Sequence, residues 1–480
     1  MDFVKKLVPE SKKLRFLAAL CMIVWAAFVG MLFFVGIFPP LLSLLASVIL
    51  LAALVGILKL LADCKDNHVK GKVGIVLAVF LIFVLATGIN YLYSTYSLFN
   101  NISDNKQVET YHVIVLRGSG YNNLDDIEGK NVYTMDFQGE ALKEAKKLLR
   151  KEVNVLYEVG GDYLETGNKL IDSKGKTHKE ILFISNSYYS ILCEEIEDFK
   201  WKTKAIHTLT VDVGKIDTTK AVNVTEDAFN IYVSGIDAYG SIGTVSRSDV
   251  NMIISVNPQT KEILLTSIPR DMYLTLHSFG KKDKLTHSGI YGINETVNTV
   301  EDWLDIDLNY YVRVNFTTLI GVVDAIGGID VESERAFKSS VSQYSYVKGT
   351  NHLSGEAALY FARERKSLGG DSERIKNQQR VVKAVIDKVA SPAILTKYTK
   401  ILKSVQSKIQ TSFTNEDITS FLQMYLGDLS NWTINSITIE GTESSGPTYS
   451  MGSNRQLYIV IPDEESVKAA QKSINGVINR

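Results

Sequence analysis

The stretch FNIYVSGIDAYGSIGTVSRSDVNMIISVNPQTKEILLTSIPRDMY, residues 229–273, decides the fold of the larger part of this chain. Its apolar, β-branched runs predict three strands, at 230–233, 250–256 and 262–267. Charged residues of both signs stand between and after these strands: Asp237, Arg247, Asp249, Arg270 and Asp271. Carboxylates bind divalent cations and arginine forks bind phosphate. The pattern therefore indicates either a binding site or an ordinary charged loop, and spacing alone does not choose between them.

Strand and helix patterns alternate after this stretch. Helices are expected at 293–304 and 317–326, and strands at 310–316 and 329–332. This β-α-β succession predicts an α/β domain with a mixed sheet and helices packed on both faces. Farther on, residues 392–431 are typical of two amphipathic helices, and 433–440 and 456–461 of strands that complete the same sheet.

A second group of basic residues follows the helix expected at 355–363, for which Ser354 is a suitable N-cap. Arg363 ends this helix and Arg365 lies two positions later. Side chains two positions apart do not share a helix face, so both reach one site only if the chain leaves helical geometry there. The loop 366–371, which contains two glycines, permits that change.

The next helix begins near Ser372 and places Arg374 and Gln378 on one face, with Asp371 just before its N-terminus. Five arginines now stand in short polar windows beside apolar elements: Arg247, Arg270, Arg363, Arg365 and Arg374. If they converge, the nearby carboxylates cannot neutralise them all, so a ligand with several negative charges is implied, and a pyrophosphate fits. No serine-histidine or cysteine-histidine set appears, but phosphoryl transfer needs mainly positioning and charge stabilisation.

The N-terminal region, 1–96, has a different character. Three apolar runs, 16–38, 41–62 and 73–93, are each long enough to cross a membrane as a helix. Lysines and an arginine precede the first run, and lysines separate the second from the third. The positive-inside rule therefore places the N-terminus in the cytoplasm and everything after the third run outside the cell. A cleaved signal peptide is the alternative for the first run, but its length and the two later runs argue against it.

Length and charge limit the remaining options. The 480 residues are too many for one ordinary domain, and a formal net charge of -1 provides no broad basic field for nucleic acid. Residues 97–215 show strand and helix patterns of their own and predict a smaller accessory α/β domain. We therefore expect a membrane anchor at 1–96, the accessory domain at 97–215, a linker at 216–228 and the main domain at 229–480.

Four separated motifs within residues 229–390 resemble the LytR-CpsA-Psr family: SRSDVNMIISVNP…SIPRDMY, KLTHSGIYG, VRVNFTTLIGVVDAIGGIDV and RERKSLGGDSERIKNQQ. The three-span anchor and the accessory domain are similar to its capsule-associated streptococcal branch. The resemblance implies an extracellular, membrane-anchored phosphotransferase. It would attach a glycopolymer, such as capsular polysaccharide, from a polyprenyl pyrophosphate carrier to peptidoglycan. Hydrolysis of the pyrophosphate, or a non-enzymatic role in regulating capsule expression, are the alternatives.

The resemblance also implies roles for individual residues. Asp237 and Asp249 would bind magnesium, with manganese as an alternative. Asp371 would orient the arginines or help to remove the acceptor proton, so Asp371, Arg270 and Arg374 form the catalytic set. The pyrophosphate would be bound by Arg247, Arg270, Arg363, Arg365, Arg374 and Gln378. An apolar tunnel for the lipid is expected from the helix at 316–326 and the face 381–389, although both are equally consistent with plain core.

Overall fold

The computed structural model describes residues 8–63, 68–102, 106–134, 140–159, 163–176, 179–215, 220–236, 242–243, 245–367, 370–389, 398–405, 408–428 and 430–480. These residues form two compact units, each described by itself. The first contains the N-terminal helices together with α14 (Tyr398–Val405) and α15 (Asn415–Gly427). The second contains the remaining helices and strands.

Among the described residues of the first unit, three helices are long and apolar enough to cross a membrane: α2 (Lys12–Val35), α3 (Pro40–Ala62) and α4 (His68–Ile102). They correspond to the three apolar runs in the sequence. Helix α14 packs against α4, and the Gln423 side chain of α15 donates to the Gly36 carbonyl after α2. The two amphipathic helices expected in the tail therefore belong to the same compact unit as the apolar helices.

The described strands of the main domain form a six-stranded mixed sheet in the order β16-β11-β6-β7-β8-β17. The opening stretch supplies three of them, β6 (Phe229–Ile236), β7 (Val250–Asn257) and β8 (Glu262–Ile268), as antiparallel neighbours. Strand β11 (Tyr310–Asn315) pairs parallel with β6, and β17 (Thr433–Thr438) pairs parallel with β8. The short β16 (Gln410–Thr411) completes one edge.

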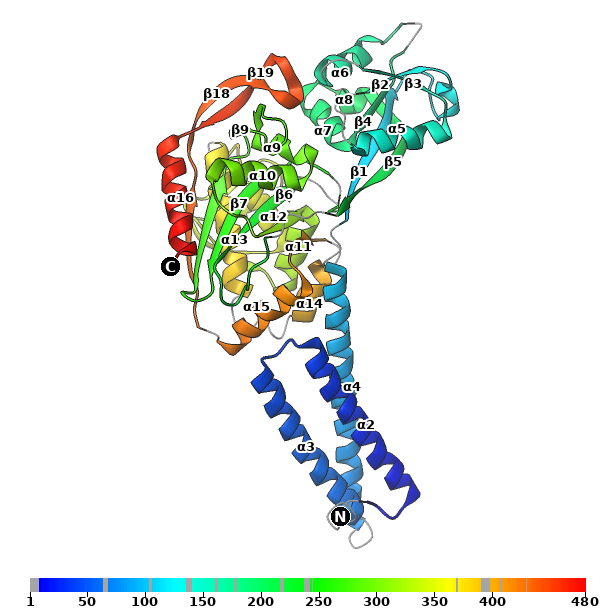
Figure 1. Ribbon diagram of the computed structural model, residues 1–480, viewed down its shortest axis with the longest axis vertical. Coiled ribbons are helices and arrows are strands. Elements are labelled where there is room, and N and C mark those ends of the chain that lie inside the picture. The colour runs from blue at the N-terminus through cyan, green and yellow to red at the C-terminus, as the bar shows by residue number, and fades with distance from the viewer. Residues whose placement is uncertain are drawn as a thin grey trace. The chain divides into compact units, whose positions relative to one another are not determined.

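Helices cover both faces of this sheet, as the sequence predicts (Figure 1). On one face Tyr232, Ile253 and Tyr311 are buried in a core with α10 (Ile293–Leu304) and α16 (Glu464–Ile478). Side chains alternate along a strand, so Val233 and Val314 point to the opposite face. There they line a cavity together with residues of α11 (Phe316–Ala325), α12 (Gly355–Arg363) and α13 (Asp371–Val389).

The last part of the chain differs from expectation in one respect. Only the first of the two strands expected there, β17, joins the sheet. The second, β19 (Gly452–Pro462), pairs with β18 (Gly441–Thr448) in a separate hairpin. Strand β18 reads GTESSGPT, a polar sequence without a strand pattern. The sequence therefore did not predict β18, the strand with which β19 pairs instead of joining the sheet.

The accessory region folds as a five-stranded sheet in the order β3-β2-β4-β1-β5. It packs onto the main domain within the same compact unit. Strand β1 (Lys106–Leu116) exchanges backbone hydrogen bonds with the main domain, Val108 N to Gly243 O and Val245 N to Val108 O. The core of the accessory domain also includes Met451 and Leu457 of the β18–β19 hairpin. The other described α-helices and β-strands of the accessory domain are β2 (Asn131–Thr134), α5 (Glu140–Glu152), β3 (Leu156–Val159), α6 (Tyr163–Asp172), β4 (Leu182–Ser185), α7 (Asn186–Glu195), α8 (Phe199–Lys202) and β5 (Thr203–Lys215).

Candidate functional site

One end of the six-stranded sheet brings together two charged residues of the opening stretch, Asp249 and Arg270. Strands β6 and β8 have their C-terminal ends there, and β7 begins there because it runs antiparallel to both. The register pairs Gly235 with Val250, so Asp249 lies just beyond the end of the β6–β7 pair. Arg270 follows the end of β8 by two residues. Residues far apart in sequence therefore meet because the ends of their strands lie side by side at the same end of the sheet.

Asp249 and Arg270 form an ion pair, with Arg270 Nη1 2.5 Å from Asp249 Oδ1. Thr286 donates to the same oxygen from 3.3 Å, and its backbone N–H donates to Arg270 O, so the KLTHS segment braces both partners. Asp249 is buried. Burial raises the pKa of Asp249, but Arg247, Arg270 and the hydrogen bonds outweigh this effect and hold it below its ordinary range. The carboxylate is therefore ionised at neutral pH.

The chain leaves helical geometry after Arg363, as the sequence requires if two arginines are to share a site. Glu364 is extended, with φ −67° and ψ 131°, and its side chain is fully buried. Its carboxylate accepts from the backbone N–H groups of Ser340, Arg365 and Ser367 at 2.6, 3.2 and 3.0 Å. Glu364 thus forms the turn that presents Arg363 and Arg365 to the same cavity.

Helix α13 supplies Arg374 and Gln378 from one face, as their four-residue spacing predicts. Arg374 is buried. Two predicted site residues lack a described side chain. Asp237 lies outside the described residues, and Asp371 is the first residue of α13 but only its backbone is described.

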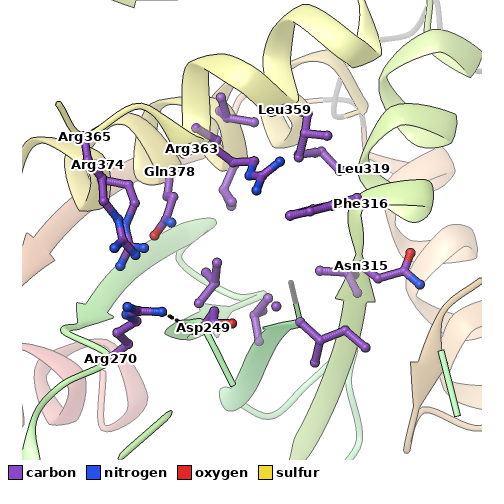
Figure 2. A pocket seen from close by; sticks show the side chains of 18 of the residues that line it. Asp249, Arg270, Asn315, Phe316, Leu319, Leu359, Arg363, Arg365, Arg374 and Gln378 are labelled. Carbon is purple, nitrogen blue, oxygen red and sulfur yellow. Dashed lines mark hydrogen bonds and ion pairs between the residues drawn. The ribbon is translucent and has the colours of Figure 1, made fainter. Parts of the chain in front are cut away.

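These elements enclose a cavity of about 410 Å³ with two chemically distinct ends. Figure 2 shows Arg270, Arg365, Arg374 and Gln378 gathered at one end, and Phe316 and Leu319 at the other. Asn315 caps α11 by accepting from the Thr318 N–H, which places Phe316 at the start of that helix. The apolar part is completed by Val233, Val250, Val314, Leu359, Val381 and Val382. The two segments expected to form a lipid tunnel thus both contribute to this wall.

Arg363 lies between the two ends. Its guanidinium carbon is 4.3 Å from the centroid of the Phe316 ring, a cation–π contact. Among the described lining residues there are four arginines, Arg270, Arg363, Arg365 and Arg374, and two carboxylates, Glu194 and Asp249. This excess of positive charge beside an apolar wall suits an amphiphile with an anionic head.

Arg247 is not among the described residues that line the cavity. Its guanidinium instead forms two hydrogen bonds of 2.5 Å with both carboxylate oxygens of Glu194, in α7 of the accessory domain. Glu194 itself lines the cavity. Sequence reasoning did not single out Glu194, since nothing in ILCEEIED distinguishes it from a solvated surface glutamate.

Serine, histidine and aspartate do meet nearby, in an arrangement that the sequence did not indicate. His287 Nδ1 lies 2.8 Å from both Asp283 Oδ1 and Ser450 Oγ, and all three residues are buried. A nucleophilic triad needs the acid and the serine on different ring nitrogens. Because both partners here share Nδ1, the cluster ties the β18–β19 hairpin to the KLTHS segment and does not activate a nucleophile.

The sequence and the structure were compared with known proteins, and similar proteins were found. The LytR_cpsA_psr family model matches residues 197–475. The polyisoprenyl-teichoic acid–peptidoglycan teichoic acid transferase TagU of Bacillus cereus is 34% identical over 216 residues, which cover 44% of this chain and 70% of that protein. TagU of Bacillus licheniformis is 34% identical over 225 residues, 46% of this chain and 72% of that protein. The crystal structure of B. subtilis TagV aligns with 30% identity and a TM-score of 0.45 over 53% of this chain and 98% of that chain.

Proposed function

We propose that this chain, which belongs to the LytR-CpsA-Psr family, transfers a glycopolymer from a polyprenyl pyrophosphate carrier to peptidoglycan. One observation carries the proposal: one cavity has Arg270, Arg365 and Arg374 at one end and an apolar wall at the other, with a fourth arginine between the two ends. A polyprenyl pyrophosphate matches both parts, with its head among the guanidinium groups and its first isoprene units along Phe316, Leu319 and Val382. The transferase activity named for the TagU relatives is the same class of reaction.

The chemistry follows from the charges. A hydroxyl oxygen of peptidoglycan attacks the phosphorus that bears the glycopolymer, and the bond from that phosphorus to the bridging oxygen breaks. Polyprenyl phosphate leaves, and Arg270, Arg365 and Arg374 stabilise the negative charge that develops on the phosphate oxygens. We assign removal of the acceptor proton to Asp371, by its resemblance to the family motif.

We propose magnesium as the metal at this site. The buried, ionised carboxylate of Asp249 is a hard oxygen ligand that suits this ion, and magnesium needs only one or two carboxylates besides phosphate and water. Asp237 would be the second. When bound, the ion neutralises phosphate charge. Titration with a chelator, followed by readdition of magnesium or manganese, tests this assignment through pyrophosphate affinity as well as turnover.

We propose capsular polysaccharide as the glycopolymer and the outer face of the membrane as the place of reaction. We choose capsular polysaccharide because the accessory domain and the three apolar helices are similar to those of the capsule-associated branch. The TagU relatives are named for teichoic acid. The location rests on the distribution of lysine and arginine around those helices. Reporter fusions after residue 102 and between α3 and α4 test the location, because opposite signals are expected from the two.

The experiment that tests the function uses the full chain in detergent or vesicles, a lipid-linked polymer donor and purified peptidoglycan. We expect a covalent polymer–peptidoglycan product that forms with release of polyprenyl phosphate. Free polymer without the adduct would identify the chain as a pyrophosphate hydrolase instead. Parallel reactions with capsular and teichoic acid donors identify the polymer, and no turnover of either would contradict the proposal.

A further inference from the structure

The strongest unexplained feature of the cavity is that an accessory-domain carboxylate stands in it. Glu194 of α7 lines the cavity together with Asp249, Arg270, Arg365 and Arg374, all of the main domain. Burial raises the pKa of Glu194, but Arg247 holds it below its ordinary range, and the charges of Asp249 and Arg270 act on the same carboxyl. The anionic side chain therefore lies within the field of the arginine cluster.

The geometry of the Glu194–Arg247 contact is that of a bound anion. Both guanidinium Nη atoms meet both carboxylate oxygens, each at 2.5 Å. A phosphate group presents two oxygens to an arginine fork in the same parallel arrangement. The fork of Arg247 thus holds a carboxylate at the place where the family resemblance expects it to hold a phosphate.

The two partners are not equally anchored. The side chain of Arg247 is 12% exposed and that of Glu194 is 53% exposed. The backbone on either side of Arg247 is held by the main domain, since Ser246 O accepts from Arg313 at 3.4 Å and Ser248 N donates to Thr286 O at 3.1 Å. The fork is therefore the fixed member, and the glutamate is the member that can turn away by changing its rotamer.

The accessory domain stays attached when Glu194 turns away, because other contacts hold it. Ser187 Oγ donates to Val245 O at 2.7 Å, and Glu195 pairs with Arg455 at 2.7 Å. The Glu194 side chain is about half exposed, so water solvates its carboxylate once it leaves the fork, and the incoming phosphate replaces it as the partner of Arg247. No separation of the domains is needed.

We infer that Glu194 is an anionic latch: it fills a phosphate subsite formed by Arg247, and the substrate pyrophosphate binds there by displacing it. This inference rests on the proposed function for the identity of the anion, and it gives the accessory domain a direct part in substrate binding. While Glu194 occupies the fork, it both blocks Arg247 and repels an anion in the neighbouring arginine cluster.

The test measures the affinity of the full chain for inorganic pyrophosphate by titration calorimetry in low salt. Removing one negative charge a few ångströms from the ligand is expected to tighten binding by about five- to ten-fold in Glu194→Gln. Glu195→Gln is the matched control, because it removes the neighbouring charge and an ion pair across the same interface, but Glu195 is not among the described residues that line the cavity. It is expected to leave the affinity unchanged.

The Arg247→Gln background distinguishes displacement of Glu194 from the Arg247 fork from simple charge repulsion between Glu194 and the ligand. The gain caused by Glu194→Gln should shrink to about two-fold or less in the Arg247→Gln background if Arg247 is the subsite. Unchanged or weaker binding in Glu194→Gln, an equal gain in Glu195→Gln, or an equal gain in both backgrounds would each overturn the latch. Failure of polymer transfer while Glu194→Gln still tightens pyrophosphate binding would instead overturn the proposed function and leave the latch in place.

Discussion

The Nη1 atom of Arg270 lies 2.5 Å from Oδ1 of Asp249, so the residue expected to bind phosphate also neutralises the residue expected to bind metal. Asp249 is buried, and Arg270 is 20% exposed in its side chain. Removing the charge of either residue therefore leaves the other without its ion-pair partner. A substitution that tests one of them should keep its charge.

Arg270→Lys is the informative substitution because it keeps the charge beside Asp249 and removes the planar fork. We expect kcat/KM for polymer transfer to fall by roughly 10- to 100-fold, since a point charge replaces bidentate phosphate contacts. The melting temperature should change little. Arg270→Ala should lose at least as much activity and also destabilise the protein, because the buried Asp249 carboxylate then loses its ion-pair partner. Wild-type turnover by Arg270→Lys would contradict the assignment of Arg270 to the phosphate site.

Arg374→Ala tests the other half of the arginine cluster, on α13. The side chain is buried and lines the cavity, so its loss should lower kcat/KM by about 100-fold or more through weaker charge stabilisation. Arg380→Ala on the same helix is the control. Arg380 pairs with Glu334 and is not among the described lining residues, so it should retain activity within about two-fold. Equal losses in the two variants would point to damage to α13 instead of loss of a ligand contact.

The apolar end of the cavity should determine affinity for the lipid but not for the head group. Leu319→Trp fills part of the space beside Phe316, and we expect binding of geranylgeranyl pyrophosphate to weaken by about ten-fold. Affinity for inorganic pyrophosphate should stay within about two-fold. Val341→Trp, at an exposed position, controls for the added aromatic surface. If Leu319→Trp weakens both ligands equally, these side chains are core and not a lipid channel.

Much of this site was predictable because strand edges and helix periodicity are local properties of the sequence. Strands β6, β7 and β8 lie where the apolar runs predict them, and their shared edge brings Asp249 to Arg270. The four-residue spacing of Arg374 and Gln378 placed both on the cavity face of α13. The main-domain part of the cavity follows from short-range patterns that converge through sheet topology.

The features that the sequence did not predict depend on contacts between distant segments, which leave no local sequence pattern. Glu194 reaches the cavity only because the accessory domain packs beside it, and packing between domains leaves no periodicity in sequence. Strand β18 forms because β19 offers it a ladder of hydrogen bonds, in spite of its own polar sequence. The sequence analysis does not single out Glu364, because its role comes from three backbone donors that converge only in the folded turn.

Glu364 gives a pH-dependent prediction. Burial raises the pKa of Glu364, but the backbone N–H groups of Ser367 and Ser340 outweigh it and lower the pKa from an ordinary 4.5 to about 2. A carboxyl with a depressed folded-state pKa stabilises the protein fully above its unfolded value, and this contribution is lost as the pH falls from about 4.5 to 2. The shift corresponds to about 3 kcal/mol at neutral pH.

Glu364→Gln should remove most of that stabilisation, because an amide NH2 would face a backbone N–H where a carboxylate oxygen now accepts. We expect a lower melting temperature at pH 7 and a difference from wild type that shrinks steadily as the pH is lowered from 4.5 towards 2. Glu356→Gln, on the preceding helix α12, is the control, since the hydrogen bond that the Glu356 carboxylate accepts from Tyr344 is exposed. Transfer activity should fall with Glu364→Gln alone, because the turn presents Arg363 and Arg365. A pH-independent difference in melting temperature would show that the charge of Glu364 does not hold this turn.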